Sequence, residues 1–338
     1  MSDVRADRDL VATVRELFRE RCPHEVVTQA EADGAAPEKL WAEVVGMGLH
    51  LVGIPEEAGG SGGTILDALA ILHAAGEQAA PLPLAETMLA AMILADAGAQ
   101  IPEGALAVVP PTAELRVEGD QVSGAAARVP WARGAELLVG VVDGKAFTAP
   151  VEVTREGVDM AGMPCDDVRI DGTVVGDTAA DLGLLGALAR SAQLAGALEA
   201  ASDLTRQYVG ERVQFGQPVG RFQAVQQHVV TLAQMAAMAS LSVDRAALAT
   251  LRGPAPFEIK ATKQVIDKNA TVAARAAHQA HGAIGMTQEY RLQQLTRRLY
   301  AWRGEYGDEK QLALELGTKI AAHGKLHEVI VAGSEIIK

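Results

Sequence analysis

The chain has 338 residues, with 43 acidic and 30 basic side chains and a formal net charge of −13. This excess of acid argues against a nucleic-acid surface, which needs a basic stripe to neutralise phosphates. Of the residues 49% are hydrophobic but only 4% are aromatic, which favours packed helices. A chain of this length is expected to divide into two or three lobes.

The cysteines and the N-terminus bear on the cellular compartment. Cys22 and Cys165 are the only cysteines, so we expect no disulfide framework and two reduced thiols. His278 and His281 are three residues apart but lack a third ligand, so no metal site is expected. The first ten residues lack an apolar core, and no apolar run is long enough to span a bilayer. These features predict a cytoplasmic protein with no membrane partner.

The first region, residues 1–103, is predicted to be an N-terminal helical domain. Leu10, Val14 and Phe18 fall on one helical face, and a second helical segment begins near Leu40. The residues between these two segments are predicted to form a polar loop.

A glycine-rich stretch at residues 53–64 interrupts this helical region. It lacks the Lys-Ser/Thr ending of a phosphate-binding loop and a preceding strand, so we interpret it as a structural turn. Thr64 is well placed to cap the next helix. Pro81 and Pro83 interrupt the helical run that follows.

Residues 104–176 are predicted to form a shortened middle β domain, because helical periodicity gives way to alternation and turns. Turns are expected at Glu118-Gly119-Asp120, at Asp143-Gly144 and at Asp171-Gly172, and the sheet is expected to be antiparallel. Strands are predicted at residues 115–117, 136–142, 146–153 and 168–175.

Helical periodicity returns after Asp181 and predicts a C-terminal helical bundle over residues 177–338. Glycine and proline break the pattern strongly at residues 216–220 and 253–256. The predicted order is therefore helices, sheet, helices. Two apolar stripes indicate the core of the bundle, formed by Phe222, Val225, Val229, Leu232 and Ala236, and by Leu292, Leu295, Leu299 and Trp302.

Two segments carry a resemblance to a known family. The segment YVGERVQFGQPVGRFQAVQ, which begins at Tyr208, is closely similar to the Arg-x-x-Phe-Gly-x-Pro-Ile/Leu-x-x-Phe-Gln-x-x-Gln signature of acyl-CoA dehydrogenases. The segment HQAHGAIGMT, which begins at His278, resembles the Gln-x-x-Gly-Gly-x-Gly motif of that family, with Ala283 in place of the second glycine. The resemblance also covers the opening helical lobe around Trp41 and the glycine-rich turn.

The resemblance implies a mainly α fold with a small central β domain: an N-terminal helical domain, an antiparallel β domain and a C-terminal four-helix bundle that carries the FAD and oligomer interface. It implies FAD as cofactor, held largely by a neighbouring subunit. A forked guanidinium beside a glycine break suits a pyrophosphate. The residues that the resemblance assigns to the cofactor are Arg212, Gln214, Phe215, Gln279, Gly282 and Gly285.

Members of this family convert an acyl-CoA thioester to the trans-2-enoyl-CoA, so the resemblance implies an acyl-CoA substrate and an electron acceptor such as electron-transfer flavoprotein. A carboxylate removes the α-proton and the flavin accepts a hydride. The family commonly places this base in a Tyr-Glu-Gly tripeptide, whereas this chain reads Glu305-Tyr306-Gly307. Glu305 is the catalytic candidate, one residue early, and the base could instead come from a partner chain.

The short β domain and the displaced Glu305 resemble the short subunit of heteromeric acyl-CoA dehydrogenases of actinobacterial steroid breakdown. The leading prediction is one subunit of an α2β2 assembly with a longer acyl-CoA dehydrogenase subunit, acting on a steroid-derived or other bulky acyl-CoA. One alternative is a self-associating homomer that uses Glu305 as base. Another is a non-catalytic scaffold subunit.

Overall fold

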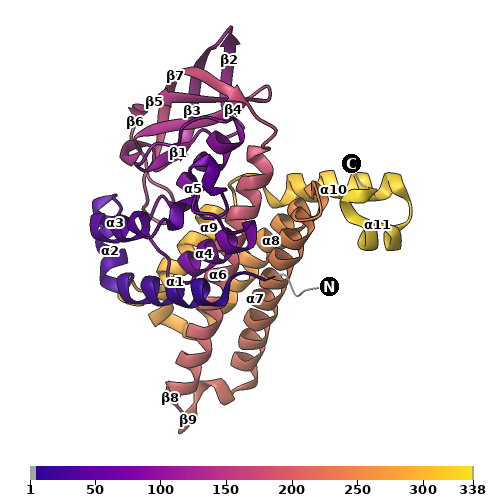
Figure 1. The fold of residues 1–338 in the computed structure, drawn as a ribbon. Helices are drawn as coiled ribbons and strands as arrows, with labels where there is room; N and C mark the ends of the chain where they lie inside the picture. Colours follow the sequence, from indigo (N-terminus) through magenta and orange to yellow (C-terminus); the bar gives the residue numbers. More distant parts are fainter. Residues whose placement is uncertain (1–4, 337–338) are drawn as a thin grey trace. The chain divides into compact units, whose positions relative to one another are not determined.

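The computed structural model describes residues 5–336. The described residues form two compact units, one of residues 5–71 and 81–186, and the other of residues 72–80 and 187–336. We refer to them as the sheet unit and the bundle unit. The fold is mainly helical with one central sheet (Figure 1). Among the described residues, no helix is long and apolar enough to cross a membrane.

Two helices, α4 (Ile65–Glu77) and α6 (Leu182–Glu211), contribute residues to both units. The three-domain division at residues 103 and 176 follows the change of secondary structure along the chain and stays a prediction. The other helices of the sheet unit are α1 (Arg8–Arg21), α2 (His24–Asp33), α3 (Glu38–Gly46), α5 (Leu84–Asp96), and the short 3-10 helices η1 (Leu49–Leu51), η2 (Glu56–Ala58) and η3 (Ala132–Gly134).

The first helices confirm one prediction and correct another. Helix α1 buries Val14 and Phe18, as its apolar spacing predicts, and the Asp7 carboxylate caps its first turn. The predicted polar loop after α1 is wrong, because helix α2 occupies it. Only Val27 and Ala30 of α2 are buried, so the sequence shows too few apolar residues to reveal a helical period.

The glycine-rich stretch is a structural turn, as predicted. Its amide groups are used within the stretch: Gly53 N donates to Gly62 O, Gly62 N to Ile54 O and Gly60 N to Pro55 O, at 2.8, 2.8 and 3.0 Å. These N–H groups are therefore not available to hold a phosphate. Thr64 precedes α4 and exchanges hydrogen bonds with Asp67, which confirms the predicted cap.

The sheet has seven strands in the order β1-β4-β5-β7-β3-β2, with β6 paired to β7. Most pairs are antiparallel, but β1 and β4 are parallel, so the sheet is mixed rather than wholly antiparallel. Helix α5 contacts β1 and β4 (Figure 1). The strands are β1 (Leu106–Val108), β2 (Glu114–Glu118), β3 (Gln121–Pro130), β4 (Leu137–Val142), β5 (Lys145–Pro150), β6 (Glu152–Arg155) and β7 (Cys165–Asp177).

Of the three predicted turns, two are confirmed and one is wrong. Gly119 and Asp120 join β2 to β3. Asp143 and Gly144 join β4 to β5 with φ of 49° and 73°, which suits a tight hairpin. Asp171 and Gly172 instead lie inside β7. A Cβ at Gly172 would lie 2.6 Å from Thr148 O on β5. Glycine is therefore required there for close approach of two strands, and not for a turn.

The bundle unit contains the long helices of the C-terminal half. Helices α7 and α8 pack side by side along their lengths (Figure 1). Leu232 and Ala236 of α7 and all four predicted apolar residues of α9 are buried, which confirms these core positions. The other three residues of the predicted α7 stripe, Phe222, Val225 and Val229, are only partly buried. The elements after α6 are β8 (Val213–Gln214), β9 (Gln217–Pro218), η4 (Val219–Arg221), α7 (Gln223–Thr250), α8 (Pro256–His281), η5 (Gly282–Met286), α9 (Leu292–Trp302), α10 (Glu309–His323), α11 (Leu326–Ala332) and η6 (Gly333–Glu335).

Within the bundle unit, the end of α4 touches α6 through a pair of glycines. A Cβ at Gly76 would lie 2.1 Å from Gln193 O, and a Cβ at Gly196 would lie 2.0 Å from His73 O. Any larger side chain at either position would push the two backbones apart. The contact places His73 against Glu199 of α6.

His73 lies between two carboxylates, with Nδ1 3.3 Å from Glu77 Oε1 and Nε2 3.3 Å from Glu199 Oε2. Burial lowers the pKa of His73, but hydrogen bonds to Glu199 and Glu77 outweigh it and raise the pKa to about 9. The three side chains have metal-ligand spacing. Because both ring nitrogens donate to carboxylates, the protonated ring leaves no lone pair for an ion, and we interpret the group as a double ion pair.

This histidine should make stability depend on pH. A pKa raised from 6.5 to about 9 stabilises the fold fully below pH 6.5, and the contribution is lost as pH rises through 9. The shift corresponds to up to about 3 kcal/mol of unfolding free energy. Urea unfolding at pH 6 and pH 10 should show a larger loss in the wild type than in His73→Gln. Equal losses in the two proteins would contradict the assignment.

Candidate active site

The end of α6 presents the first predicted motif. Arg212 follows the last residue of α6, and its N–H donates to Tyr208 O while its carbonyl accepts from Val219 N, both at 2.8 Å. These bonds close the two-stranded hairpin of β8 and β9 onto the helix end. At its tip Phe215 has φ +52° and is 91% exposed. A large apolar side chain held in the left-handed region and exposed to this degree indicates contact with another molecule.

The end of α8 presents the second motif. Gln279 is exposed in the last turn, and Gly282 ends the helix with φ +65°. Gly285 is buried, and a Cβ there would lie 2.8 Å from Cβ of His281. Glycine at this position therefore lets the backbone fold back tightly after the helix. The exposed Gly282 backbone carries no side chain that would shield it from a ligand.

Three rings packed against one another bring these two motifs together. Tyr208, one turn before Arg212, stacks on His281 with ring centroids 4.5 Å apart and an interplanar angle of 20°. Tyr290 lies 5.8 Å from Tyr208 and 5.1 Å from His281. The ends of α6 and α8 are thus fixed next to each other by aromatic packing.

His281 adds a buried acceptor to this end of the bundle. It is 4% exposed, and burial lowers its pKa, so the ring is neutral. Its Nδ1 lies 2.9 Å from Ala277 O and must carry the proton to donate there. Its Nε2 is then an acceptor, and the described residues give it no hydrogen-bond partner. A bound group with a donor would satisfy it.

These residues fit a flavin dinucleotide. A pyrophosphate needs a guanidinium or amide donors and backbone that can approach closely, and Arg212, Gln214 and Gln279 supply such donors beside Gly282. All three side chains are exposed. They therefore point away from the core of this chain, as the family resemblance implies for groups that reach a cofactor held by a second chain.

Glu305 lies in a different part of the bundle unit, in the turn after α9. Its Oε2 accepts hydrogen bonds from Nε and Nη2 of Arg190 on α6, both at 2.7 Å. Arg190 is 3% exposed, donates to Gln193 Oε1 at 2.6 Å, and lies 5.9 Å from the ring of Trp302. The Glu305 carboxylate is therefore bound to a buried cation that other contacts hold in place.

A second buried ion pair supports the same turn. Lys263 and Asp267 of α8 have fully buried side chains, with Nζ 2.6 Å from Oδ2. The same Nζ donates to the carbonyls of Arg303 and Gly307, at 2.9 and 3.2 Å. Between these two carbonyls lies Tyr306, with φ +56°. Lys263 therefore ties both ends of the turn that carries Glu305.

Burial acts on the pKa values of this pair in opposite directions. Burial lowers the pKa of Lys263 and raises that of Asp267 to about 7, while each residue stabilises the charge of the other. Because Nζ has four oxygen acceptors within hydrogen-bond distance, we assign the pair as charged. Removing one partner would leave a buried charge without its counterion.

The structure thus brings together some of the predicted residues and separates another. Arg212, Gln214 and Phe215 lie next to the segment with Gln279, because Tyr208 stacks on His281. Glu305 contacts Arg190, which is 22 residues before Arg212 on α6, or about 33 Å along a helix. Glu305 is therefore not beside the predicted pyrophosphate donors.

Sequence reasoning missed the residues that support these sites. Lys263 and Asp267 are an opposite charge pair at i and i+4 on α8, and the apolar residues around them were a usable signal. Arg190 interrupts an apolar run, which also marks a buried cation that needs a partner. The identity of that partner is not readable from spacing, because Glu305 is 115 residues away.

Two stretches of this chain match domains of known proteins. The chain matches the acyl-CoA dehydrogenase N-terminal domain over residues 5–101 and the C-terminal domain of the same family over residues 184–309. It is 31% identical over 300 residues to the acyl-CoA dehydrogenase IpdE2 of Mycolicibacterium smegmatis, which covers 85% of this chain and 90% of the relative.

Solved structures share the fold. A variant of the Tcur3481-Tcur3483 steroid ACAD superposes with a TM-score of 0.85 at 23% identity, covering 94% of this chain and 98% of the other. The ChsE4-ChsE5 complex from Mycobacterium tuberculosis gives 0.81 at 20% identity, covering 93% and 96%. From the two domain matches and the similarity to IpdE2, the chain belongs to the acyl-CoA dehydrogenase family.

Proposed function

We propose that this chain takes part in the FAD-dependent dehydrogenation of an acyl-CoA thioester to the trans-2-enoyl-CoA, as one subunit of a heteromeric enzyme. The observation that carries the proposal is the stack of Tyr208 on His281. It joins both cofactor motifs at one end of the bundle unit with Arg212 and Gln279 exposed. Bound FAD would supply the hydride acceptor.

The residues of this chain would bind and orient the cofactor at an interface with a longer acyl-CoA dehydrogenase subunit in an α2β2 assembly. Arg212 would neutralise the pyrophosphate, and Gln214 and Gln279 would donate hydrogen bonds to it. Phe215 would exclude water from the interface between the two subunits. Two of the similar solved structures carry paired names, Tcur3481-Tcur3483 and ChsE4-ChsE5. The first of these is named as a steroid enzyme, which supports a steroid-derived or other bulky acyl-CoA as substrate.

We also propose a cytoplasmic location and a protein electron acceptor. Cys22 and Cys165 are buried and not joined to each other, which suits the reducing cytoplasm. Reduced flavin would pass its electrons to an acceptor such as electron-transfer flavoprotein.

A non-catalytic scaffold subunit is the second candidate function, and the displaced Glu305 is the observation that favours it.

For the proton-abstracting base, we propose a carboxylate of the partner subunit. Oε2 of Glu305 is bound to the guanidinium of Arg190, which Gln193 holds as well, so this oxygen is engaged by a buried cation rather than by a substrate. The alternative is a homomer in which Glu305 is the base. The two assignments predict different effects of a single substitution.

Glu305→Gln is expected to leave turnover of the mixed enzyme nearly unchanged, because the amide oxygen can still accept from Arg190. If Glu305 were the base, turnover would fall by about 10²–10⁴-fold. The measurement is the rate of enoyl-CoA formation by the enzyme loaded with FAD. Glu309→Gln, which removes a carboxylate paired to Arg303 near the same turn, is the matched control.

The assembly itself is tested by colour. Flavin absorbance that appears only when the chain is co-purified with the longer subunit supports the heteromer. A yellow protein from this chain alone would instead support the homomer, and a colourless protein in both preparations would leave the scaffold.

A further inference from the structure

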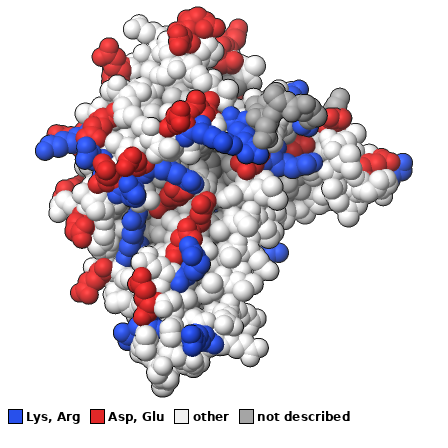
Figure 2. Space-filling model, turned by 60° about the horizontal axis from the view of Figure 1, so that its bottom comes forward, with Lys and Arg blue, Asp and Glu red and all other residues white. Residues whose placement is uncertain are grey.

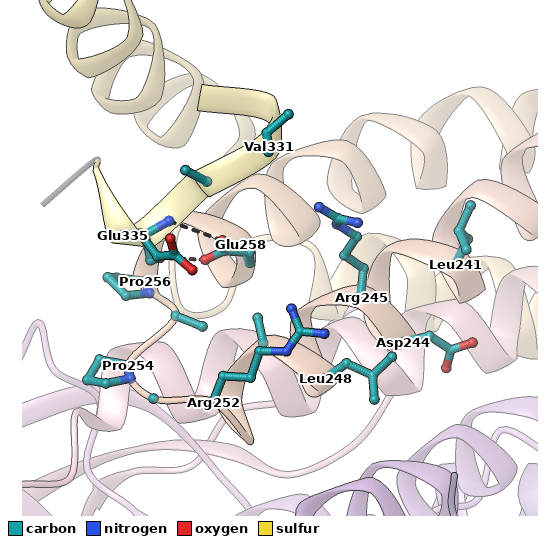
Figure 3. A pocket seen from close by; sticks show the side chains of 15 residues that line it. Leu241, Asp244, Arg245, Leu248, Arg252, Pro254, Pro256, Glu258, Val331 and Glu335 are labelled. Atoms are coloured by element: carbon teal, nitrogen blue, oxygen red, sulfur yellow. Dashed lines mark hydrogen bonds between the residues drawn. The ribbon is translucent and has the colours of Figure 1, made fainter. Parts of the chain in front are cut away.

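The charged side chains of the molecule fall into two kinds, exposed and buried. Figure 2 shows both signs interspersed over the face drawn. In the groove lined by α7, α11 and η6, the charged side chains of Asp244, Arg245, Arg252 and Glu335 are all exposed (Figure 3). Solvated charges of both signs select no particular ligand. Arg190 differs from them, because its side chain is only 3% exposed and a buried guanidinium requires a negative partner.

The ion pair of Arg190 and Glu305 is fixed on the side of the cation. Besides Glu305, the guanidinium donates to Gln193 Oε1 at 2.6 Å and lies 5.9 Å from the ring centroid of Trp302. Gln193 and Trp302 are themselves buried. The Glu305 side chain, in contrast, is 24% exposed and belongs to a turn. The cation is therefore preorganised, and solvent reaches the pair from the side of the carboxylate.

The turn that carries Glu305 is held at both ends and strained between them. Nζ of Lys263 binds the carbonyl at each end, at 2.9 and 3.2 Å. Tyr306, between these carbonyls, has φ +56°, which a residue with a side chain adopts at a cost. At Gly304 a Cβ would meet open space, and glycine rotates readily. Rotation of the peptide groups between the two held carbonyls would relieve Tyr306 and carry Glu305 away from Arg190.

The charges around this turn decide what could replace Glu305. The other buried or half-buried charges that the structure describes there balance as pairs, Lys263 with Asp267 and Arg303 with Glu309. Asp308 is exposed, and its carboxylate accepts from the first amides of α10. A group that displaces Glu305 must therefore bring one negative charge to Arg190. Glu305 itself shows that the planar guanidinium is placed for a carboxylate.

We propose that Arg190 is the receptor for a carboxylate of a ligand, and that Glu305 is an intramolecular substitute which this carboxylate displaces. The ring of Trp302 beside the guanidinium suits a hydrocarbon chain next to the acid group. Naming the ligand rests on the proposed function: it is an acyl-CoA thioester whose acyl part carries a second, unesterified carboxylate. Glu305 then has a role other than that of the base.

The test is binding to the purified chain, measured by isothermal titration calorimetry without flavin and without turnover. One probe is adipyl-CoA, whose acyl chain ends in a carboxylate. The second is hexanoyl-CoA, which has the same chain length and ends in a methyl group, and the third is adipate alone. Because no flavin takes part, failure of this inference leaves the flavin content of the mixed enzyme, which tests the proposed function, as a separate result.

The wild-type chain should bind adipyl-CoA about tenfold more tightly than hexanoyl-CoA, because its carboxylate gains charge-assisted hydrogen bonds to Arg190. In Glu305→Gln the competing group is neutral and binds the guanidinium less strongly, so the preference should rise by about another tenfold. In Arg190→Met the preference should disappear. Glu309→Gln, which removes a carboxylate beside the same turn, is the matched control and should keep the wild-type preference.

Glu305→Gln should remain folded by circular dichroism, because its amide oxygen still accepts from Arg190, so the test does not depend on Arg190→Met. Equal affinities for adipyl-CoA and hexanoyl-CoA in both the wild type and Glu305→Gln would overturn the proposal, and so would a lack of adipyl-CoA binding to either protein. Adipate that binds as tightly as adipyl-CoA would overturn the thioester as the ligand and leave an organic acid in its place.

Discussion

Replacing Arg212 with alanine is expected to remove most of the FAD from the assembled enzyme. The guanidinium is exposed at the end of α6 and would make charge-assisted hydrogen bonds to the pyrophosphate. Such bonds contribute about 1.5–3 kcal/mol each. Loss of one or two of them should weaken FAD binding by about 10²-fold. The ratio of flavin to protein absorbance after gel filtration measures the effect.

Arg206→Ala is the matched control for this experiment. Arg206 lies six residues before Arg212, on α6, and forms an ion pair with Asp203 at the surface, so its removal should leave the flavin content unchanged. Arg212→Lys should recover only part of the binding, because an ammonium cannot donate in the forked geometry of a guanidinium. Full flavin content in Arg212→Ala would remove this residue from the cofactor site.

The parts of the fold that sequence reasoning reached are those with a strong local signal. The apolar stripe from Leu292 to Trp302 gave α9, and the breaks at residues 216–220 and 253–256 gave the ends of the long helices. Helix α2 was missed because only Val27 and Ala30 are buried on it. A short helix with two core contacts leaves little periodicity in its sequence.

The role of glycine was predicted correctly at a turn and wrongly at a position where two strands lie close together. The pair Asp143-Gly144 forms the expected hairpin, whereas Gly172 lies within β7 because Thr148 O leaves no room for a Cβ. The two uses look alike in a sequence. Only the identity of the neighbouring strand separates them, and that neighbour is set by tertiary pairing.

Prediction of the candidate site from the sequence has the same limit, because tertiary contacts leave no local pattern. The motif residues are recognisable because they are consecutive, as around Arg212. The contact that orders them, Tyr208 on His281, and the contact that holds Glu305, from Arg190, join residues that are far apart in the chain. Long-range pairing of this kind has no local pattern.

Replacing Lys263 with methionine is expected to destabilise the protein by about 3–5 kcal/mol, because Asp267 would be left as a buried charge without its partner. The carbonyls of Arg303 and Gly307 would also lose their donor. The free energy of unfolding in urea, followed by circular dichroism, measures the effect. Lys260→Met, which breaks a partly exposed pair with Glu315 on the same helix, should change it by only about 1 kcal/mol.

The double variant K263M/D267L separates a buried ion pair from simple loss of packing. Two apolar side chains of similar size remove the unpaired charge, so most of the stability lost in Lys263→Met should return. The two carbonyls of the turn would remain without Nζ, so the recovery should be incomplete. If Lys263→Met and the double variant were equally unstable, the burial of an unpaired Asp267 charge would not be the cause. The contacts of Lys263 with the turn that carries Glu305 would then account for the loss.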